Sequence, residues 1–285
     1  MGEFIEIVEV GPRDGLQNEA RAIPVSEKVA LIDCLSKVGF RRIEAASFVS
    51  ARWVPQMAGS ADVMARIHRA PGVIYSALTP NLRGFEDALE AGVDEVAVFA
   101  SASEGFSRAN INASISESLV RFRSVMDAAG AANMPVRGYV SCVVDCPFDG
   151  PVAPEAVADV TAELLAMGCH EVSLGDTLGR ATPEKVDAML AAVLDVADAS
   201  DLAGHFHDTA GHAIENVMTA IGRGVKAFDA AVGGLGGCPY APGAAGNVAT
   251  AALATALGLR GFDHGLDLDR LAEASAMAVA MRGET

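Results

Sequence analysis

The chain has 285 residues and is 51% hydrophobic, which suffices for one large domain with a substantial core. Its formal net charge of −16 argues against a nucleic-acid partner, because phosphate backbones are bound by basic surfaces. No apolar stretch is long enough to cross a bilayer and no targeting segment is visible, so we expect a cytoplasmic protein without a membrane partner. The five scattered cysteines also favour a reducing compartment over a disulfide framework.

Apolar runs bounded by turn residues recur along the chain and predict eight strands. Several of these runs are continuously hydrophobic, as in parallel strands that are covered on both faces. The predicted strands are Phe4–Val10, Arg42–Phe48, Val73–Leu78, Glu95–Ala100, Val136–Ser141, Glu171–Leu174, Leu202–His207 and Ala227–Val232.

Amphipathic segments with helix start and stop signals separate these strands. Ser26 is expected to cap one helix, and Asn81 precedes another. Pro154 and Pro183 stand near the first turns of two further helices, where proline is tolerated. The segment Leu266–Met281 predicts one or two additional helices at the C-terminus.

Four glycines mark a repeated unit, because each precedes an apolar strand residue by four positions. A glycine at such a place ends a helix in a left-handed conformation before the next strand begins. The four are Gly39, Gly92, Gly168 and Gly224. Strands begin about every 32 residues, and eight such units fill the ~250 residues typical of a (β/α)8 barrel.

The sequence therefore predicts a single α/β domain over residues 1–285. We expect a (β/α)8 TIM barrel over about residues 4–262, followed by a C-terminal helical extension over about residues 263–285. A doubly wound open sheet is the competing fold, but eight evenly spaced units favour closure of the barrel.

Polar residues follow the ends of several predicted strands, where barrel enzymes carry their active sites. His205 and His207 are two apart on one strand, so both imidazoles point to the same face and can share an ion. Barrel closure lets Asp14 approach that ion from the other side, and Asn247 can add a neutral oxygen. The four residues predict a divalent metal site, against the alternative that the two histidines only form local hydrogen bonds.

The donor types leave the identity of the ion open. Oxygen ligands suit Mg²⁺ or Mn²⁺, while two imidazoles would also accept Co²⁺ or Zn²⁺. Two imidazoles, one carboxylate and one amide oxygen leave about two positions of an octahedral shell for a chelating substrate.

Cys238 stands in a glycine-rich segment, Gly233–Pro239, after the last predicted strand. Glycines permit backbone shapes that other residues do not reach, and they indicate a mobile loop. The segment lacks a dinucleotide fingerprint, because no G-x-G-x-x-G opens a βαβ unit here. Cys238 is a candidate catalytic thiol, and a buried structural thiol is the alternative.

Seven short segments carry a more specific signal. They are VEVGPRDGLQNE at 8–19, SFVS at 47–50, WVPQM at 53–57, LTPNL at 78–82, VRGYVSC at 136–142, SLGDT at 173–177 and GLGGCPYA at 234–241. With these segments the chain closely resembles the 3-hydroxy-3-methylglutaryl-CoA (HMG-CoA) lyase family over about 260 residues. Ala210 departs from the family pattern, which usually has tyrosine there, and is expected to reshape the substrate pocket.

The resemblance implies a divalent-metal-dependent carbon–carbon lyase that cleaves (S)-HMG-CoA to acetyl-CoA and acetoacetate, as in leucine catabolism. It also implies an acyl-CoA thioester as partner and a homodimer as the assembly. Carried onto this chain, it implies metal ligands Asp14, His205, His207 and Asn247, catalytic residues Arg13, Cys238, Glu44 and Asp176, and substrate contacts from Arg13 and Gln17.

The expected chemistry fits these residue types. The metal would lower the pKa of the substrate's tertiary hydroxyl, and Asp14 or His207 would take its proton. Cleavage of the C2–C3 bond leaves an enolate whose charge Arg13 can offset, and Cys238 can return a proton to carbon.

Three other functions are open on the sequence. The first is a lyase for citramalyl-CoA or for a longer 3-substituted glutaryl-CoA. The second is a Claisen condensing enzyme of the isopropylmalate or homocitrate synthase type, which the Gly237–Pro239 segment disfavours because those enzymes carry Glu-Arg there. The third, a catalytically silent binding protein, is disfavoured because every expected polar residue is present. Arg108, Asn110 and Asn112 are candidate CoA contacts, with a solvated loop as the alternative.

Overall fold

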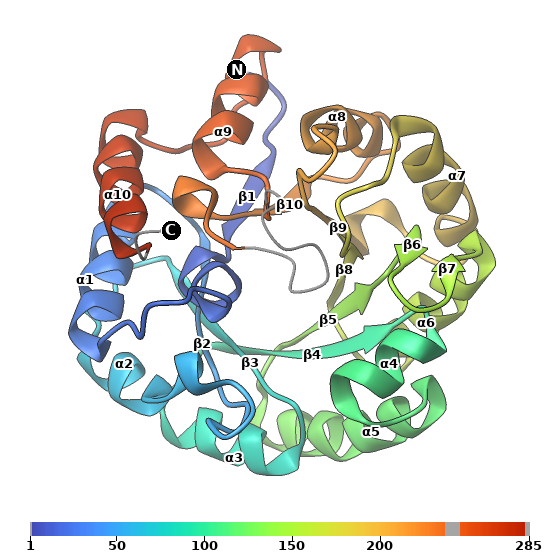
Figure 1. Cartoon of the computed structure of the whole chain (residues 1–285), viewed down its shortest axis with the longest axis horizontal. Helices are drawn as coiled ribbons and strands as arrows, with labels where there is room; N and C mark the ends of the chain where they lie inside the picture. The colour runs from blue at the N-terminus through green and yellow to red at the C-terminus, as the bar shows by residue number, and fades with distance from the viewer. Residues whose placement is uncertain (1, 237–245, 283–285) are drawn as a thin grey trace.

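The computed structural model describes residues 2–236 and 246–282, so Cys238 lies outside the described residues. Within the described residues, eight parallel strands close into a barrel in the order β1-β10-β9-β8-β5-β4-β3-β2. Helices surround the strands in an outer ring, as Figure 1 shows. The predicted fold class, an α/β (β/α)8 TIM barrel with additional C-terminal helices, is confirmed.

The barrel strands differ from the predicted ones by no more than two residues at either end. They are β1 (Glu6–Glu9), β2 (Arg42–Ser47), β3 (Ile74–Leu78), β4 (Glu95–Ser101), β5 (Val136–Ser141), β8 (Glu171–Asp176), β9 (Leu202–Phe206) and β10 (Ala227–Ala230). A two-stranded hairpin outside the barrel pairs β6 (Asp145–Cys146) with β7 (Gly150–Pro151). Strand β1 is shorter than predicted because Phe4 forms only an isolated bridge with Asp263 and Val10 already opens a helical turn.

Ten α-helices within the described residues connect and cover the strands. They are α1 (Val25–Leu35), α2 (Ser60–Arg66), α3 (Leu82–Glu90), α4 (Glu104–Ile111), α5 (Ile115–Ala132), α6 (Pro154–Ala166), α7 (Pro183–Val193), α8 (Ala213–Gly222), α9 (Thr250–Leu259) and α10 (Leu268–Met281). Short turns of helix occur at η1 (Gly11–Gly15), η2 (Pro55–Met57), η3 (Ala199–Asp201) and η4 (Val232–Gly234). None of the helices in these residues is both long enough and apolar enough to cross a membrane.

Several predicted helix signals are confirmed and one is wrong. Asn81 caps α3 by accepting a hydrogen bond from the N–H of Gly84, and Pro154 and Pro183 open their helices at the first turn. Helix α1 instead begins at Val25 with Pro24 in the cap position. Ser26 therefore lies inside the first turn, because the fixed backbone angle of the proline starts the helix two residues earlier than expected.

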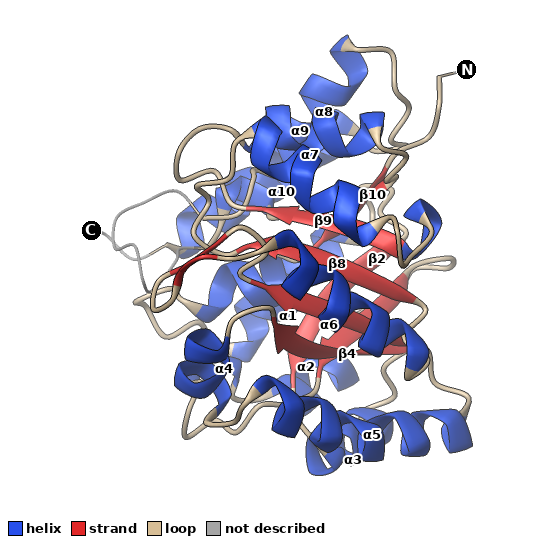
Figure 2. Cartoon of the chain, turned by 90° about the vertical axis from the view of Figure 1, so that its right-hand side faces the viewer, coloured by secondary structure: helices blue, strands red, loops and turns tan. Residues whose placement is uncertain are grey.

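The left-handed conformation predicted for the four repeated glycines is confirmed by the backbone. Gly39, Gly92, Gly168 and Gly224 have φ angles of 110°, 71°, 106° and 95°. All four lie in the left-handed region that L-residues with side chains rarely adopt. Gly92, Gly168 and Gly224 each directly follow the C-cap of a helix, whereas Gly39 ends the turns that follow α1, which itself ends at Leu35. All four glycines direct the chain into the next parallel strand, and the C-terminal ends of these strands meet at one mouth of the barrel. Figure 2 shows these strands crossing the centre of the molecule with helices on either side.

Candidate metal centre and active site

A turn of π-helix, η1, follows β1 directly and carries Arg13 and Asp14. The carbonyl of Val10 accepts hydrogen bonds from the backbone N–H groups of Arg13 and Asp14 at 3.1 and 2.8 Å. Pro12 stands in the first turn of η1. N–H groups in a first turn have no acceptor within the helix, so a proline, which has no N–H, is well tolerated there. This tight turn holds the two polar side chains at the mouth of the barrel.

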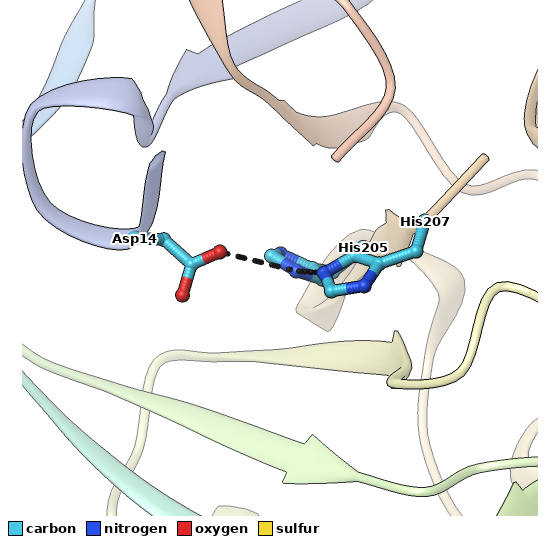
Figure 3. Close-up of side chains that lie close together, drawn as sticks. All are labelled: Asp14, His205 and His207. Atoms are coloured by element: carbon cyan, nitrogen blue, oxygen red, sulfur yellow. Dashed lines mark hydrogen bonds and ion pairs between the residues drawn. The ribbon is translucent and has the colours of Figure 1, made fainter. Parts of the chain in front are cut away.

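Asp14, His205 and His207 converge at that mouth, as Figure 3 shows. The Nε2 atoms of His205 and His207 lie 3.3 Å apart, and Asp14 Oδ2 lies 3.9 Å from His205 Nε2. The three side chains offer ligand atoms that all lie within 4.8 Å of one another, which makes the cluster a possible metal site. Asn247 joins it, since its Nδ2 lies 2.7 Å from Asp14 Oδ2 and its backbone bridges to that of His207.

The charge states of Asp14 and His207 fit a divalent cation. Burial would raise the pKa of Asp14, but Arg13 and His205 outweigh it and lower that pKa to about 2. Burial and the neighbouring His205 lower the pKa of His207 to about 4. At neutral pH Asp14 and His207 therefore offer a carboxylate and a neutral imidazole, the forms that bind metal ions without first losing a proton. Burial would lower the pKa of His205, but Asp229 and Asp14 raise it, so a metal ion competes with a proton for this ring.

Asp229 on β10 is a residue that sequence reasoning missed. Its Oδ2 lies 3.0 Å from His205 Nδ1, so the ring presents Nε2 to the cluster. A carboxylate behind a metal-binding histidine fixes the tautomer and the orientation of the ring. Asp229 is 1% exposed, accepts a hydrogen bond from Ser173 Oγ at 2.8 Å and pairs with Arg137 at 2.8 Å. Burial would raise the pKa of Asp229, yet Arg137 keeps it well below its usual range.

Arg13 links the metal cluster to the interior of the barrel. Its Nε donates to Glu44 Oε2 and its Nη1 to Asp14 Oδ1, each at 2.6 Å. Glu44 is 1% exposed and Arg13 is 6% exposed, so the guanidinium is held from two sides in a desolvated position. A cation fixed there acts on a developing negative charge far more strongly than it would in water.

A cavity of about 650 Å³ opens from the metal cluster toward α4 and α5. Next to the metal cluster the cavity is lined by Arg13, Asp14, Gln17 and the two histidines, so the predicted substrate contacts Arg13 and Gln17 both line it. Asn110 and Asn112 line the far end, whereas Arg108 pairs with Glu104. One wall is apolar and consists of Val49, Leu78, Phe99 and Tyr139. The cavity thus combines a polar, charged region beside the cluster with a partly apolar wall.

Asp176 is not brought to this cluster. Its carboxylate accepts hydrogen bonds from the backbone N–H groups of Gly179 and Ala181 at 3.1 and 2.8 Å, which ties it to its own loop. Ala210 is exposed and is not among the described residues that line the cavity. The structure therefore shows no direct contact between Ala210 and the cavity that would support the expected effect on pocket shape.

The HMGL-like family model matches residues 4–278 of the chain. Hydroxymethylglutaryl-CoA lyase, mitochondrial, of Gallus gallus is 54% identical over 267 residues, covering 94% of this chain and 90% of the relative. The 3-hydroxy-3-isohexenylglutaryl-CoA/hydroxy-methylglutaryl-CoA lyase of Pseudomonas aeruginosa is 52% identical over 281 residues, covering 99% and 94%. The solved HMG-CoA lyase of Brucella melitensis superimposes with a TM-score of 0.98 at 58% identity, covering 99% of this chain and 100% of that one. The chain therefore belongs to the HMGL-like family and is a carbon–carbon lyase.

Proposed function

We propose that this protein cleaves (S)-3-hydroxy-3-methylglutaryl-CoA to acetyl-CoA and acetoacetate. The observation that carries the proposal is the placement of Arg13 beside the Asp14, His205 and His207 cluster in the wall of the cavity. A cation held by the cluster would bind the oxygen atoms of the substrate, and the buried guanidinium of Arg13 would face its thioester group. The names of its relatives, which are more than 50% identical over nearly the whole chain, support the same reaction.

The proposed metal ligands are Asp14, His205, His207 and Asn247. A divalent cation held there would supply Lewis-acid activation of the substrate's tertiary hydroxyl. The donor set suits Mg²⁺ or Mn²⁺, and its two imidazoles also accept Co²⁺ or Zn²⁺.

The protein's own groups carry the rest of the reaction. Asp14 or His207, both unprotonated at neutral pH, takes the hydroxyl proton. The C–O bond becomes the ketone of acetoacetate while the electrons of the C2–C3 bond pass to the thioester. Arg13, fixed by Glu44, offsets the charge of the resulting enolate. Cys238 then donates a proton to carbon and completes acetyl-CoA, while Gln17 contacts the substrate and Asp176 shapes the adjoining loop.

A longer 3-substituted glutaryl-CoA is a second candidate substrate, and the apolar wall favours it. Leu78, Phe99 and Tyr139 form a small cluster apart from the main core and face the cavity. An aliphatic branch on C3 would find apolar contacts there, and the P. aeruginosa relative is named for such a substrate as well as for HMG-CoA. Steady-state turnover of HMG-CoA, citramalyl-CoA and an isohexenylglutaryl thioester ranks the three. Absence of acetoacetate from HMG-CoA would remove the first proposal.

We also propose a cellular compartment and an assembly for the enzyme. Cys34, Cys142, Cys146 and Cys169 are free thiols, which supports a reducing compartment such as the cytoplasm. We also propose a homodimer, and light scattering coupled to gel filtration tests that assembly directly.

A further inference from the structure

Glu9, the last residue of β1, is a buried carboxylate that the proposed chemistry does not use. Its side chain has no measurable exposure. It enters no ion pair among the residues that the structure describes, so no cation compensates its burial. Burying a carboxylate costs free energy unless hydrogen-bond donors surround it. The donors around Glu9 therefore indicate which parts of the chain it holds together.

Three donors from three separate segments meet this carboxylate. The N–H groups of Gly11 and Val232 both donate to Oε1 at 2.8 Å, and the hydroxyl of Thr250 donates to Oε2 at 2.7 Å. Gly11 begins η1, Val232 begins η4 and Thr250 begins α9. One side chain thus joins segments that lie more than 200 residues apart in the sequence.

Two of those segments adjoin proposed metal ligands. The turn that starts at Gly11 carries Asp14, and Asn247 lies three residues before Thr250. Asp14 and Asn247 meet at 2.7 Å, so their separation depends on how the two segments are held relative to each other. The packing at the junction is close, because a Cβ on Gly11 would lie 2.5 Å from Glu9 Oε1 and about 3 Å from Val232.

We propose that Glu9 is a positioning residue that holds the Asp14 turn and the Asn247 segment in the register that metal binding needs. The inference rests on the proposed function only in taking Asp14 and Asn247 as ligands. Loss of the carboxylate leaves two backbone N–H groups and one hydroxyl without their buried acceptor. The segments then relax apart, and the ligand set loses its preorganisation.

The test is the affinity of the full-length protein for Mn²⁺, measured by calorimetry, together with kcat and KM for HMG-CoA. Glu9→Ala is expected to weaken Mn²⁺ binding by about 10- to 100-fold, the range seen when a supporting partner of a metal ligand is lost. Glu9→Gln is expected to restore most of the affinity, because its amide oxygen still accepts from Gly11 and Val232 while its NH2 group faces the Thr250 hydroxyl. Thr250→Val removes one of the three donors and is expected to give a smaller loss.

Glu95→Ala is the matched control. Glu95 is equally a buried carboxylate at a strand end, but it pairs with His170 at the opposite mouth of the barrel. It is expected to reduce thermal stability while leaving Mn²⁺ affinity unchanged. Parent-like Mn²⁺ affinity in Glu9→Ala, or an equal loss in Glu95→Ala, would overturn the inference. If Glu9→Ala does not fold, parent-like affinity in Thr250→Val overturns it. A parent protein that binds Mn²⁺ but cleaves no HMG-CoA would refute the proposed function alone.

Discussion

Replacing Asp229 by asparagine isolates the charge behind His205 while keeping the shape of the side chain. Asparagine can still accept a hydrogen bond from His205 Nδ1, which now lies 3.0 Å from the carboxylate. It cannot neutralise Arg137, whose guanidinium lies 2.8 Å from Asp229 and is 2% exposed. The variant therefore loses the electrostatic support of the imidazole and one of the counter-charges of a buried arginine.

Two magnitudes follow from these contacts. Breaking a buried ion pair from one side costs about 3–5 kcal/mol of folding free energy, and the lower end applies because Arg137 keeps Glu171 at 2.6 Å. Loss of a carboxylate behind a metal-binding histidine costs about 10- to 100-fold in metal affinity. We expect about tenfold weaker Mn²⁺ binding, since the acceptor oxygen remains.

Calorimetric titration with Mn²⁺, at a temperature where both proteins are folded, measures the loss of metal affinity. Urea unfolding measures the loss of folding free energy. Glu95→Gln is the control, because it removes the charge from another buried carboxylate–imidazole contact, that with His170 at 2.7 Å. It should lose stability and keep its Mn²⁺ affinity. An Asp229→Asn protein that binds Mn²⁺ as tightly as the parent would refute the role assigned to Asp229.

Three further predictions concern other residues. Arg13→Met should lower kcat by about 10²- to 10³-fold without weakening Mn²⁺ binding, because it removes a fixed cation from the enolate; a parent-like kcat in steady-state assays would contradict this. Cys238→Ala should lose most turnover while circular dichroism and Mn²⁺ titration remain normal, and full activity would remove Cys238 from the mechanism. Burial would raise the pKa of Glu171, but Arg137 and Arg42 lower it from 4.5 to about 2, so the ionised form stabilises the folded state. That contribution, about 3 kcal/mol, is present above pH 4.5 and is lost as pH falls toward 2. In urea unfolding, the free energy of unfolding of Glu171→Gln should therefore fall less steeply between pH 4.5 and 2 than that of the parent. An unchanged pH dependence would contradict the assignment.

The barrel could be predicted from the sequence because its signals are local and repeated. A glycine such as Gly92 needs only its own backbone to end a helix, and an apolar run such as Val136–Ser141 needs only its own composition to form a buried strand. The start of α1 differs from the prediction because Pro24, and not Ser26, occupies the N-cap position. The fixed φ angle of Pro24 decides between the two residues. End residues of strands such as β1 depend on pairing partners that the sequence does not specify.

The metal cluster could be predicted from the sequence for a different reason. The spacing of His205 and His207 places them on one face, and barrel closure alone brings Asp14 to them. Asp229 and Glu9 were missed because each sits within an apolar strand, where its direction and partners depend on long-range packing. The available signal was an acidic residue inside an apolar run: Asp229 in Ala227–Val232, and Glu9, together with Glu6, in Phe4–Val10. A buried strand tolerates a carboxylate only with specific partners.

The most direct test of the proposed reaction compares the chelated protein with the same protein given Mn²⁺ or Mg²⁺. Purified (S)-HMG-CoA is added to each, and acetoacetate and acetyl-CoA are quantified separately. The placement of Asp14, His205 and His207 predicts equimolar amounts of the two products from the metal-loaded protein and almost none from the chelated one. Equal turnover with and without metal, or no acetoacetate from the metal-loaded protein, would contradict the assignment.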